Sequence, residues 1–102
     1  MRVPGNMQKM MQQAQKMQEQ LQQQIAEIRV EASTGGGMVT VRMDGHKNVL
    51  SIQIEEDALE DCEMLQDMVR GAVNEAAKRV DDEAQGKMGG MLGGLGLPPG
   101  ML

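Results

Sequence analysis

The sequence predicts a two-layer α+β fold with the element order α-β-β-β-α. Two long stretches, one near each end of the chain, repeat apolar residues every three or four positions, which is typical of amphipathic helices. Between them, residues 30–55 alternate apolar and polar side chains, as strands of a half-buried sheet do. Glycine-containing turns divide this middle region into three short strands. An antiparallel meander packed against long helices combines these features.

The first helix is expected to run from Asn6 to about Ile28. Asn6 follows Pro4-Gly5 and is a good N-cap, because its side-chain oxygen can accept a free N–H of the first turn. A helix of this length spans roughly 33 Å. The segment is rich in glutamine, as some disordered tracts are, but its apolar residues recur at heptad positions and between them, which favours a packed helix. We interpret these residues as a core or dimer seam: Met7, Met10, Ala14, Met17 and Leu21.

Three strands joined by two short turns are expected to form an antiparallel meander. Apolar and polar residues alternate in the segments 30–33, 38–43 and 50–55. The turns are Gly35-Gly36-Gly37 and Asp44-Gly45, because glycine tolerates positive φ angles. Such a sheet has one apolar face and one polar face.

The second helix is expected to begin near Glu60 or Asp61 and to end near Gln85. Acidic residues crowd its first turn, where they complement the helix dipole. Its apolar stripe, at steps of three and four, consists of Cys62, Leu65, Val69, Ala72, Ala76 and Val80. Glycine is frequent from Gly86 onward. We therefore expect residues 1–87 to form a single domain and residues 88–102 to form a flexible glycine-rich tail.

The composition predicts an oligomer. The chain has 102 residues and no Phe, Tyr or Trp, so its core must use aliphatic residues, alanine and many of the twelve methionines. Aromatic side chains normally bury the most area, and this core therefore gains less from burial than most. Ordering the backbone costs roughly 1–2 kcal/mol per residue, which leaves a lone monomer marginal. Burial between subunits would supply the missing stability.

Charge is unevenly distributed along the chain. The net charge of -5 argues against a purely electrostatic nucleic-acid binder, because such domains are usually basic. Residues 55–67 are rich in Asp and Glu and contain no base, whereas Arg2, Lys9 and Lys16 precede the first acid, Glu19. These three bases recur every seven residues, roughly 10 Å apart along a helix. The spacing suits contact with an anion such as a phosphate backbone.

No catalytic or metal-binding constellation is recognisable. His46 stands beside a turn without a second His or a Cys that would complete a zinc site. The acidic cluster at 55–63 lacks the order of a calcium loop, and Gly35-Gly36-Gly37 precedes a strand rather than a phosphate-binding helix. Cys62, the single cysteine, excludes an internal disulfide and is expected to be a packed thiol. Without a membrane span or signal peptide, we expect a cytoplasmic protein that is not an enzyme and uses no cofactor, metal or small-molecule substrate.

The order and spacing of several short motifs resemble the YbaB/EbfC family of bacterial nucleoid-associated proteins. The resemblance covers nearly the whole chain. Its motifs are Gly5-Asn6, Met11–Gln18, the glycine turn leading into Met38–Val41, Asp44-Gly45, Ile52–Ile54, Glu63–Leu65, Val73–Val80 and Leu97–Gly100.

This resemblance implies a homodimer with long helices that project like tweezers from a central sheet. It also implies binding to duplex DNA with little or no sequence preference, and a role in nucleoid organisation and gene regulation. The present chain departs from many relatives in carrying glutamine where they carry lysine. The candidate DNA-binding residues are Arg2, Lys9, Lys16, Lys78, Arg79 and Lys87. For Lys78 and Arg79, pairing with neighbouring acids of the second helix is an open alternative.

The absence of aromatic residues narrows the mode of binding. Base stacking, which single-strand readers use, is not available to this chain. The glutamines could read base edges in the major groove, but a glutamine-rich helix face is more often a solubilising surface. Phosphate contacts by a dimer, with a modest preference for DNA shape, are therefore favoured. The alternative hypothesis is an acidic, tweezer-like protein-interaction module that uses the methionine-rich surface of the first helix (Met7, Met10, Met11 and Met17).

Overall fold

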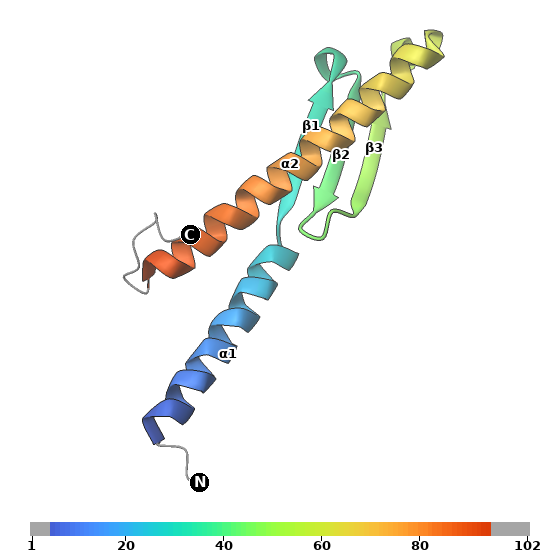
Figure 1. Cartoon of the computed structure of the whole chain (residues 1–102). Helices are drawn as coiled ribbons and strands as arrows, with labels where there is room; N and C mark the ends of the chain where they lie inside the picture. Colours follow the sequence, from blue (N-terminus) through green and yellow to red (C-terminus); the bar gives the residue numbers. More distant parts are fainter. Residues whose placement is uncertain (1–4, 95–102) are drawn as a thin grey trace.

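The computed structural model describes residues 5–94, and the side chains of residues 5–90. It confirms the predicted α+β architecture (Figure 1). The elements are α1 (Gly5–Ala26), β1 (Arg29–Thr34), the 3-10 turn η1 (Gly35–Gly37), β2 (Val39–Asp44), β3 (Val49–Ile54), the 3-10 helix η2 (Glu56–Glu60) and α2 (Cys62–Gly94). The molecule is elongated, with extents of 70 × 25 × 17 Å. Neither helix of residues 5–94 is long and apolar enough to cross a membrane.

The three strands form the predicted antiparallel meander in the order β1-β2-β3. Val39 of β2 lies opposite Thr34 on one side and Ile54 on the other. The register of β3 shifts beside Arg42 and Met43, where a bulge interrupts the pairing. As a result Val49 lies opposite Met43, where an uninterrupted register would place Leu50.

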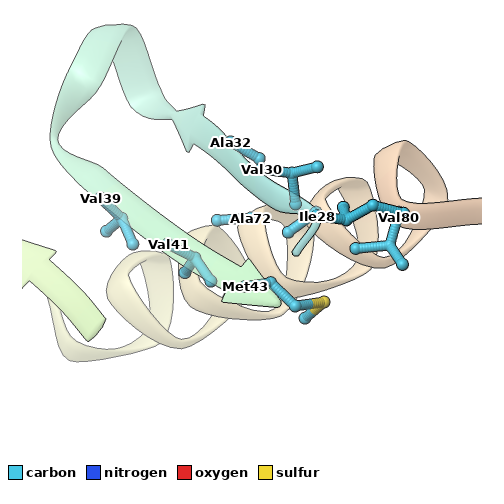
Figure 2. Packing of buried hydrophobic residues seen from close by; sticks show 9 residues of the cluster. Ile28, Val30, Ala32, Val39, Val41, Met43, Ala72 and Val80 are labelled. Carbon is cyan, nitrogen blue, oxygen red and sulfur yellow. The ribbon is translucent and has the colours of Figure 1, made fainter. Parts of the chain in front are cut away.

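The core lies between α2 and one face of the sheet (Figure 2). Its buried members are all aliphatic, alanine or methionine side chains: Ile28, Val30, Ala32, Val39, Val41, Met43, Ala72, Ala76 and Val80. Ala72 and Ala76 present only a methyl group to the sheet, which lets α2 lie close to β1 and β2. The helix packs on these two strands, and the apolar residues of β3 are left partly uncovered.

A side-chain cap fixes the start of α2. Asp61 precedes the helix in an extended conformation, and its Oδ1 accepts a hydrogen bond from the backbone N–H of Met64 at 3.1 Å. This bond satisfies one of the N–H groups that a helix leaves free at its first turn. The prediction of a start near residues 60–61 is therefore confirmed to within two residues. The short helix η2, with Ala58 buried, was not predicted.

The helix α1 ends where the chain turns into the sheet. It begins at Gly5 and stops at Ala26, two residues earlier than predicted, because Ile28 turns into the core. The guanidinium of Arg29 donates hydrogen bonds to the carbonyls of Ala26 and Ile28, at 2.9 and 2.8 Å, and so satisfies carbonyls at the helix end. Ile25 is the residue of α1 that packs against the core cluster.

The end of the second helix was wrongly predicted. It was expected near Gln85, with no regular structure from Gly86 onward, but α2 continues to Gly94. Each glycine costs roughly 1 kcal/mol relative to alanine. An existing helix nevertheless extends with one hydrogen bond per added residue and no new nucleation cost. Residues 95–102 lie outside the described part of the chain, and the flexibility of residues 88–102 stays a prediction.

Cys62 was also wrongly predicted. The thiol was expected to pack on the apolar stripe, but Cys62 is exposed. It is the first residue of α2, beyond the part of the stripe that forms the buried cluster. His46 lies exposed beside the turn between β2 and β3, as predicted.

Gly45 supports a testable prediction about this packing. A Cβ at this position would overlap the backbone carbonyl oxygen of Ile25, so Gly45 lets the β2–β3 turn contact the end of α1. We expect Gly45→Ala to lower the free energy of unfolding by about 1–3 kcal/mol, the usual cost of overpacking, as measured by urea denaturation. Gly86→Ala is the control, because open space surrounds this helical position and the change should stabilise α2. Equal stability of the Gly45→Ala variant and the wild type would contradict the close approach.

Candidate nucleic-acid interface

Two helical arms project from the same end of the sheet (Figure 1). One is α1 and the other is the C-terminal half of α2, and the helices contact each other. Three of the predicted DNA-binding residues, Lys9, Lys16 and Lys87, lie on these arms. The first residue of the predicted stripe, Arg2, lies outside the described residues.

The two lysines of α1 are exposed. No ion pair joins Lys9 or Lys16 to another residue of the described range 5–94. The first acid of the helix, Glu19, follows both lysines. The N-terminal part of this arm is therefore locally positive in a chain whose net charge is -5.

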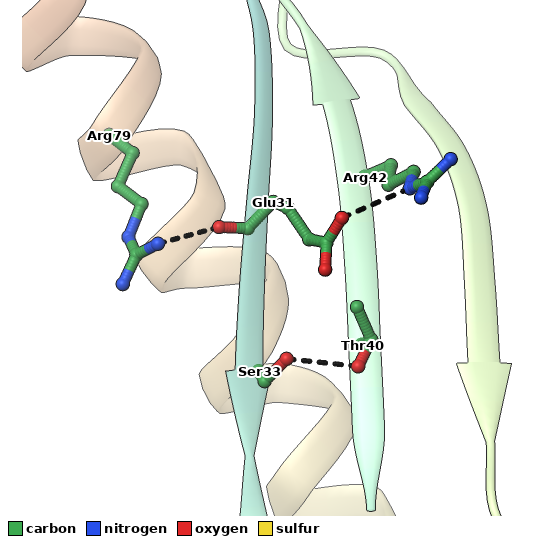
Figure 3. Close-up of polar contacts among 5 residues, drawn as sticks. All are labelled: Glu31, Ser33, Thr40, Arg42 and Arg79. Atoms are coloured by element: carbon green, nitrogen blue, oxygen red, sulfur yellow. Dashed lines mark hydrogen bonds and ion pairs between the residues drawn. The ribbon is translucent and has the colours of Figure 1, made fainter. Parts of the chain in front are cut away.

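Arg79 is held within the fold. Its Nη1 donates a hydrogen bond of 2.6 Å to the backbone carbonyl of Glu31 on β1 (Figure 3), and its Nε lies 3.6 Å from a carboxylate oxygen of Glu75. The side chain of Glu31 in turn accepts a hydrogen bond from Arg42 on β2 at 3.2 Å. Arg79 thus fastens α2 to the outer edge of the sheet.

The other two predicted bases of α2 differ in their surroundings. Lys78 is exposed and Lys87 is half-buried near the end of the helix. The acids Asp81, Asp82 and Glu83 lie between them along the helix. This arm is therefore less positive than α1.

The acidic cluster lies at the end of the molecule away from the arms. Residues 55–67, which contain no base, form η2 and the first turns of α2 (Figure 1). Exposed Leu59 and Met64 lie within this cluster. The charge segregation seen along the sequence is thus a separation in space, and an anionic ligand at the arms would be distant from most of these acids.

The predicted seam is not covered within one chain. None of the residues of α1 is buried. Met7 and Met10 are 52% and 66% exposed, Ala14 is exposed, and Met17 and Leu21 are half-buried. Neighbouring Met11 is 64% exposed. The role of the seam in a dimer stays a prediction.

The turn between β2 and β3 supports the base of the arms. Lys47, with a φ of 64°, forms an ion pair of 2.9 Å with Asp81 on α2. Asp44 Oδ1 accepts hydrogen bonds from the backbone N–H groups of Asn48 and His46. The Asn48 backbone bond is the main cause that lowers the pKa of Asp44 below its ordinary value of 3.8.

One surface feature was not predicted from the sequence. The strand β3 exposes four apolar side chains, Val49, Leu50, Ile52 and Ile54, which are between 40% and 51% exposed. The strand sequence VLSIQI contains no charged residue, and this lack of charge is the sequence signal for the exposed apolar strand. The alternation of residues alone predicts only that the strand is half-buried.

These features describe a small α+β protein with an exposed basic helix and an acidic opposite end. The model of the YbaB/EbfC DNA-binding family matches residues 4–95. The chain therefore belongs to the YbaB/EbfC DNA-binding family, as the resemblance predicted.

Relatives with assigned names are similar over nearly their full lengths. A nucleoid-associated protein of Acidobacterium capsulatum is 45% identical, over 96% of this chain and 97% of that protein. Another, of Koribacter versatilis, is 47% identical over 91% and 94%. The fold is similar to the crystal structure of an uncharacterized protein from Helicobacter pylori, with a TM-score of 0.73 and 25% identity over 89% of this chain and 99% of that one.

The hydrogen bond from Arg79 to the Glu31 carbonyl, called the Arg79 tether here, predicts that Arg79 contributes to stability and that neighbouring Lys78 does not. We expect Arg79→Gln to lower the free energy of unfolding by about 1 kcal/mol, because the Glu31 carbonyl loses its side-chain donor. Lys78→Gln, one residue away and exposed, should change stability by less than about 0.5 kcal/mol. Urea denaturation of both variants provides the measurement. If Arg79→Gln were as stable as Lys78→Gln, the tether would contribute nothing.

The lowered pKa of Asp44 predicts a pH-dependent contribution to stability. Because the folded-state pKa lies below 3.8, the ionised form stabilises the fold above that value, and the contribution is lost as the pH falls through the folded-state pKa. We expect Asp44→Asn to be less stable than the wild type at pH 7, and the difference to shrink below pH 3.8. Urea denaturation as a function of pH tests this, with exposed Asp82→Asn as the control. A difference that does not change with pH would contradict it.

Proposed function

We propose that this protein is a non-enzymatic, homodimeric nucleoid protein that binds duplex DNA with little or no sequence preference. The observation that carries the proposal is the exposed positive stripe of α1, whose Lys9 and Lys16 have no ion-pair partner within residues 5–94. Membership of a DNA-binding family and the names of the relatives support it. The protein would act in the cytoplasm, at the nucleoid, in DNA organisation and gene regulation.

The proposed contacts are made to phosphates. A lysine on a helix acts as a mobile point charge, which suits phosphate oxygens better than the fixed donor pattern of a base edge. Lys9 and Lys16 lie roughly 10 Å apart along α1. Arg2, seven residues before Lys9 in the sequence, is a further proposed contact. The chain has no aromatic side chain on which a base could stack. Contacts of this kind discriminate little between sequences.

The bases of α2 have subordinate roles in this proposal. Exposed Lys78 and half-buried Lys87 would add contacts once α1 has engaged the duplex. Arg79 would reach a phosphate only by sharing its guanidinium with the Glu31 carbonyl or by leaving it. We therefore assign most of the binding free energy to α1.

A second candidate function is supported by one observation. Met7, Met10 and Met11 are between 52% and 66% exposed on the same arm. Methionine side chains are flexible and polarizable, and they suit surfaces that bind varied protein partners. In that case the arm would bind another protein, and its lysines would be ordinary solvated charges.

A salt titration of duplex DNA binding tests the proposed function. For phosphate contacts, the logarithm of the affinity falls with the logarithm of the salt concentration, by roughly 0.9 per neutralised phosphate. We expect the double variant Lys9→Glu, Lys16→Glu to bind more weakly and to show a shallower slope, by about 0.9 for each phosphate that it no longer neutralises. Fluorescence anisotropy with a labelled duplex of random sequence provides the measurement.

Arg70→Glu is the control, because it makes the same basic-to-acidic change as each of the two lysine substitutions, at an exposed residue near the acidic end, where Arg70 pairs with Asp67. This variant should keep the wild-type slope. If the wild type does not bind DNA at low salt, or if the lysine variant binds as the wild type does, the DNA proposal is wrong and the protein-partner function is favoured.

A further inference from the structure

Three methionine side chains lie together on the N-terminal half of α1. Met7, Met10 and Met11 are each more than half exposed, and none of the residues of α1 is buried. Residues three or four positions apart are neighbours on a helix surface, with Cβ atoms roughly 5–6 Å apart. Met10 and Met11 are therefore both neighbours of Met7 on one face of the helix.

The direction of helical side chains favours the convergence of these thioethers. Long side chains on a helix lean toward its N-terminus, so Met10 and Met11 lean over the turn that carries Met7. Half-buried Met17 leans in the same way over Ala14, whose small methyl group leaves room for it. A methionine side chain has three rotatable bonds, which lets several sulfurs approach one point.

The donor atoms on this face suit a soft metal ion. Residues 5–18 contain no His, Cys, Asp or Glu, so a hard divalent cation finds neither a carboxylate nor an imidazole there. Thioether sulfur is a soft, neutral donor that selects Cu(I). The sequence-based prediction of no metal site was based on His, Cys and carboxylate ligands alone. Thioether ligands make a different kind of site.

The positive stripe of α1 lies on the opposite side of the helix. Lys9 is two positions from both Met7 and Met11, and residues two positions apart do not share a face, because each residue turns the helix by about 100°. Lys16 follows Ala14 by two positions and faces away from it for the same reason. An ion at the methionines is therefore separated from the lysine side chains, and the proposed phosphate contacts stay free.

We propose that three thioethers, those of Met7, Met10 and Met11, form a Cu(I) site on the surface of α1. Met17, on the following turn, supplies a fourth sulfur. Each sulfur donates a lone pair to the ion, and binding releases no proton because a thioether carries none. The bound ion links successive turns of a helix that has no buried residue, and so stabilises the arm. The site goes beyond the proposed DNA binding and does not depend on it.

An anaerobic titration with Cu(I) tests the site. The full chain with Cys62→Ser, which removes the exposed thiol as a competing ligand, competes for Cu(I) with the chromophoric chelator ferrozine. We expect this parent protein to bind a single ion. Adding Met10→Leu and Met11→Leu keeps an apolar surface of helix-forming residues. It should lower the affinity by at least about tenfold, since it removes two ligands.

Met64→Leu in the same Cys62→Ser background is the matched control. It makes the same substitution at an exposed methionine of the acidic cluster, away from the arm. This variant should bind Cu(I) as the parent does. Circular dichroism verifies that each variant is folded.

The pH dependence is a readout that a histidine or carboxylate site would not share. The affinity of a thioether site should stay constant between about pH 7 and about pH 5, because no ligand gains a proton, whereas a site built on imidazole would weaken over this range.

Methyl NMR locates the bound ion, since Cu(I) is diamagnetic. The signals of Met7, Met10 and Met11 should shift on addition of Cu(I). Those of buried Met43 and of Met64 should not.

The outcomes separate the metal site from DNA binding. Absence of Cu(I) binding by the parent, or equal affinity of the parent and the Met10→Leu, Met11→Leu variant, would overturn the site. An affinity that falls at low pH, or methyl shifts confined to Met64, would overturn it as well. A chain that binds Cu(I) at these methionines but shows no salt-dependent DNA binding would leave the site intact and contradict only the proposed function.

Discussion

The structure depends on the close contact between the small residues of α2 and the apolar face of a narrow sheet. Ala72 and Ala76 let the helix backbone approach β1 and β2, where valine and methionine side chains fill the remaining space. The absence of aromatic residues makes this contact thin, and it covers two strands of three. The third strand is left half-exposed, and α1 joins the core through little more than Ile25. The exposure of β3 and the exposure of the α1 arm therefore both follow from the same limited core.

The free arm also explains how an acidic protein can present a basic surface. Surface charges separated by more than about 8–10 Å are largely screened at physiological salt. The acids of residues 55–67 lie at the far end of a molecule 70 Å long, so they oppose an anion at the N-terminal part of α1 only weakly. The acids near the middle of α2 oppose an anion at the arms more strongly than the acids of residues 55–67 do. One of them, Asp81, forms an ion pair with Lys47.

The order of elements could be predicted from the sequence because it depends on local periodicity. Alternation in the strands and three- and four-residue steps in the helices identified every main element, and Asp61 acts as the expected cap of α2. The end of α2 could not be predicted in this way, since glycine propensity is a local quantity whereas helix extension is cooperative. The exposure of Cys62 and of β3 depends on where α2 crosses the sheet, which periodicity does not encode.

The candidate site was predicted less completely. Lys9 and Lys16 could be placed on an exposed face because their spacing matches a helix and no acid precedes Glu19. The role of Arg79 could not be foreseen, because its partner on β1 is 48 residues away in the sequence. The alternative of pairing with a neighbouring acid is confirmed for Arg79 through Glu75.

The central claim is that DNA is bound by the α1 arm, and the methionines of this chain allow a direct measurement. Methyl NMR of labelled methionines reports on both ends of the molecule, since Met7, Met10 and Met11 lie on the arm and Met64 lies in the acidic cluster. On addition of a duplex at low salt, we predict shifted signals for the three arm methionines and unchanged signals for Met64 and buried Met43. Shifts confined to Met64, or no shifts at saturating DNA, would contradict the claim.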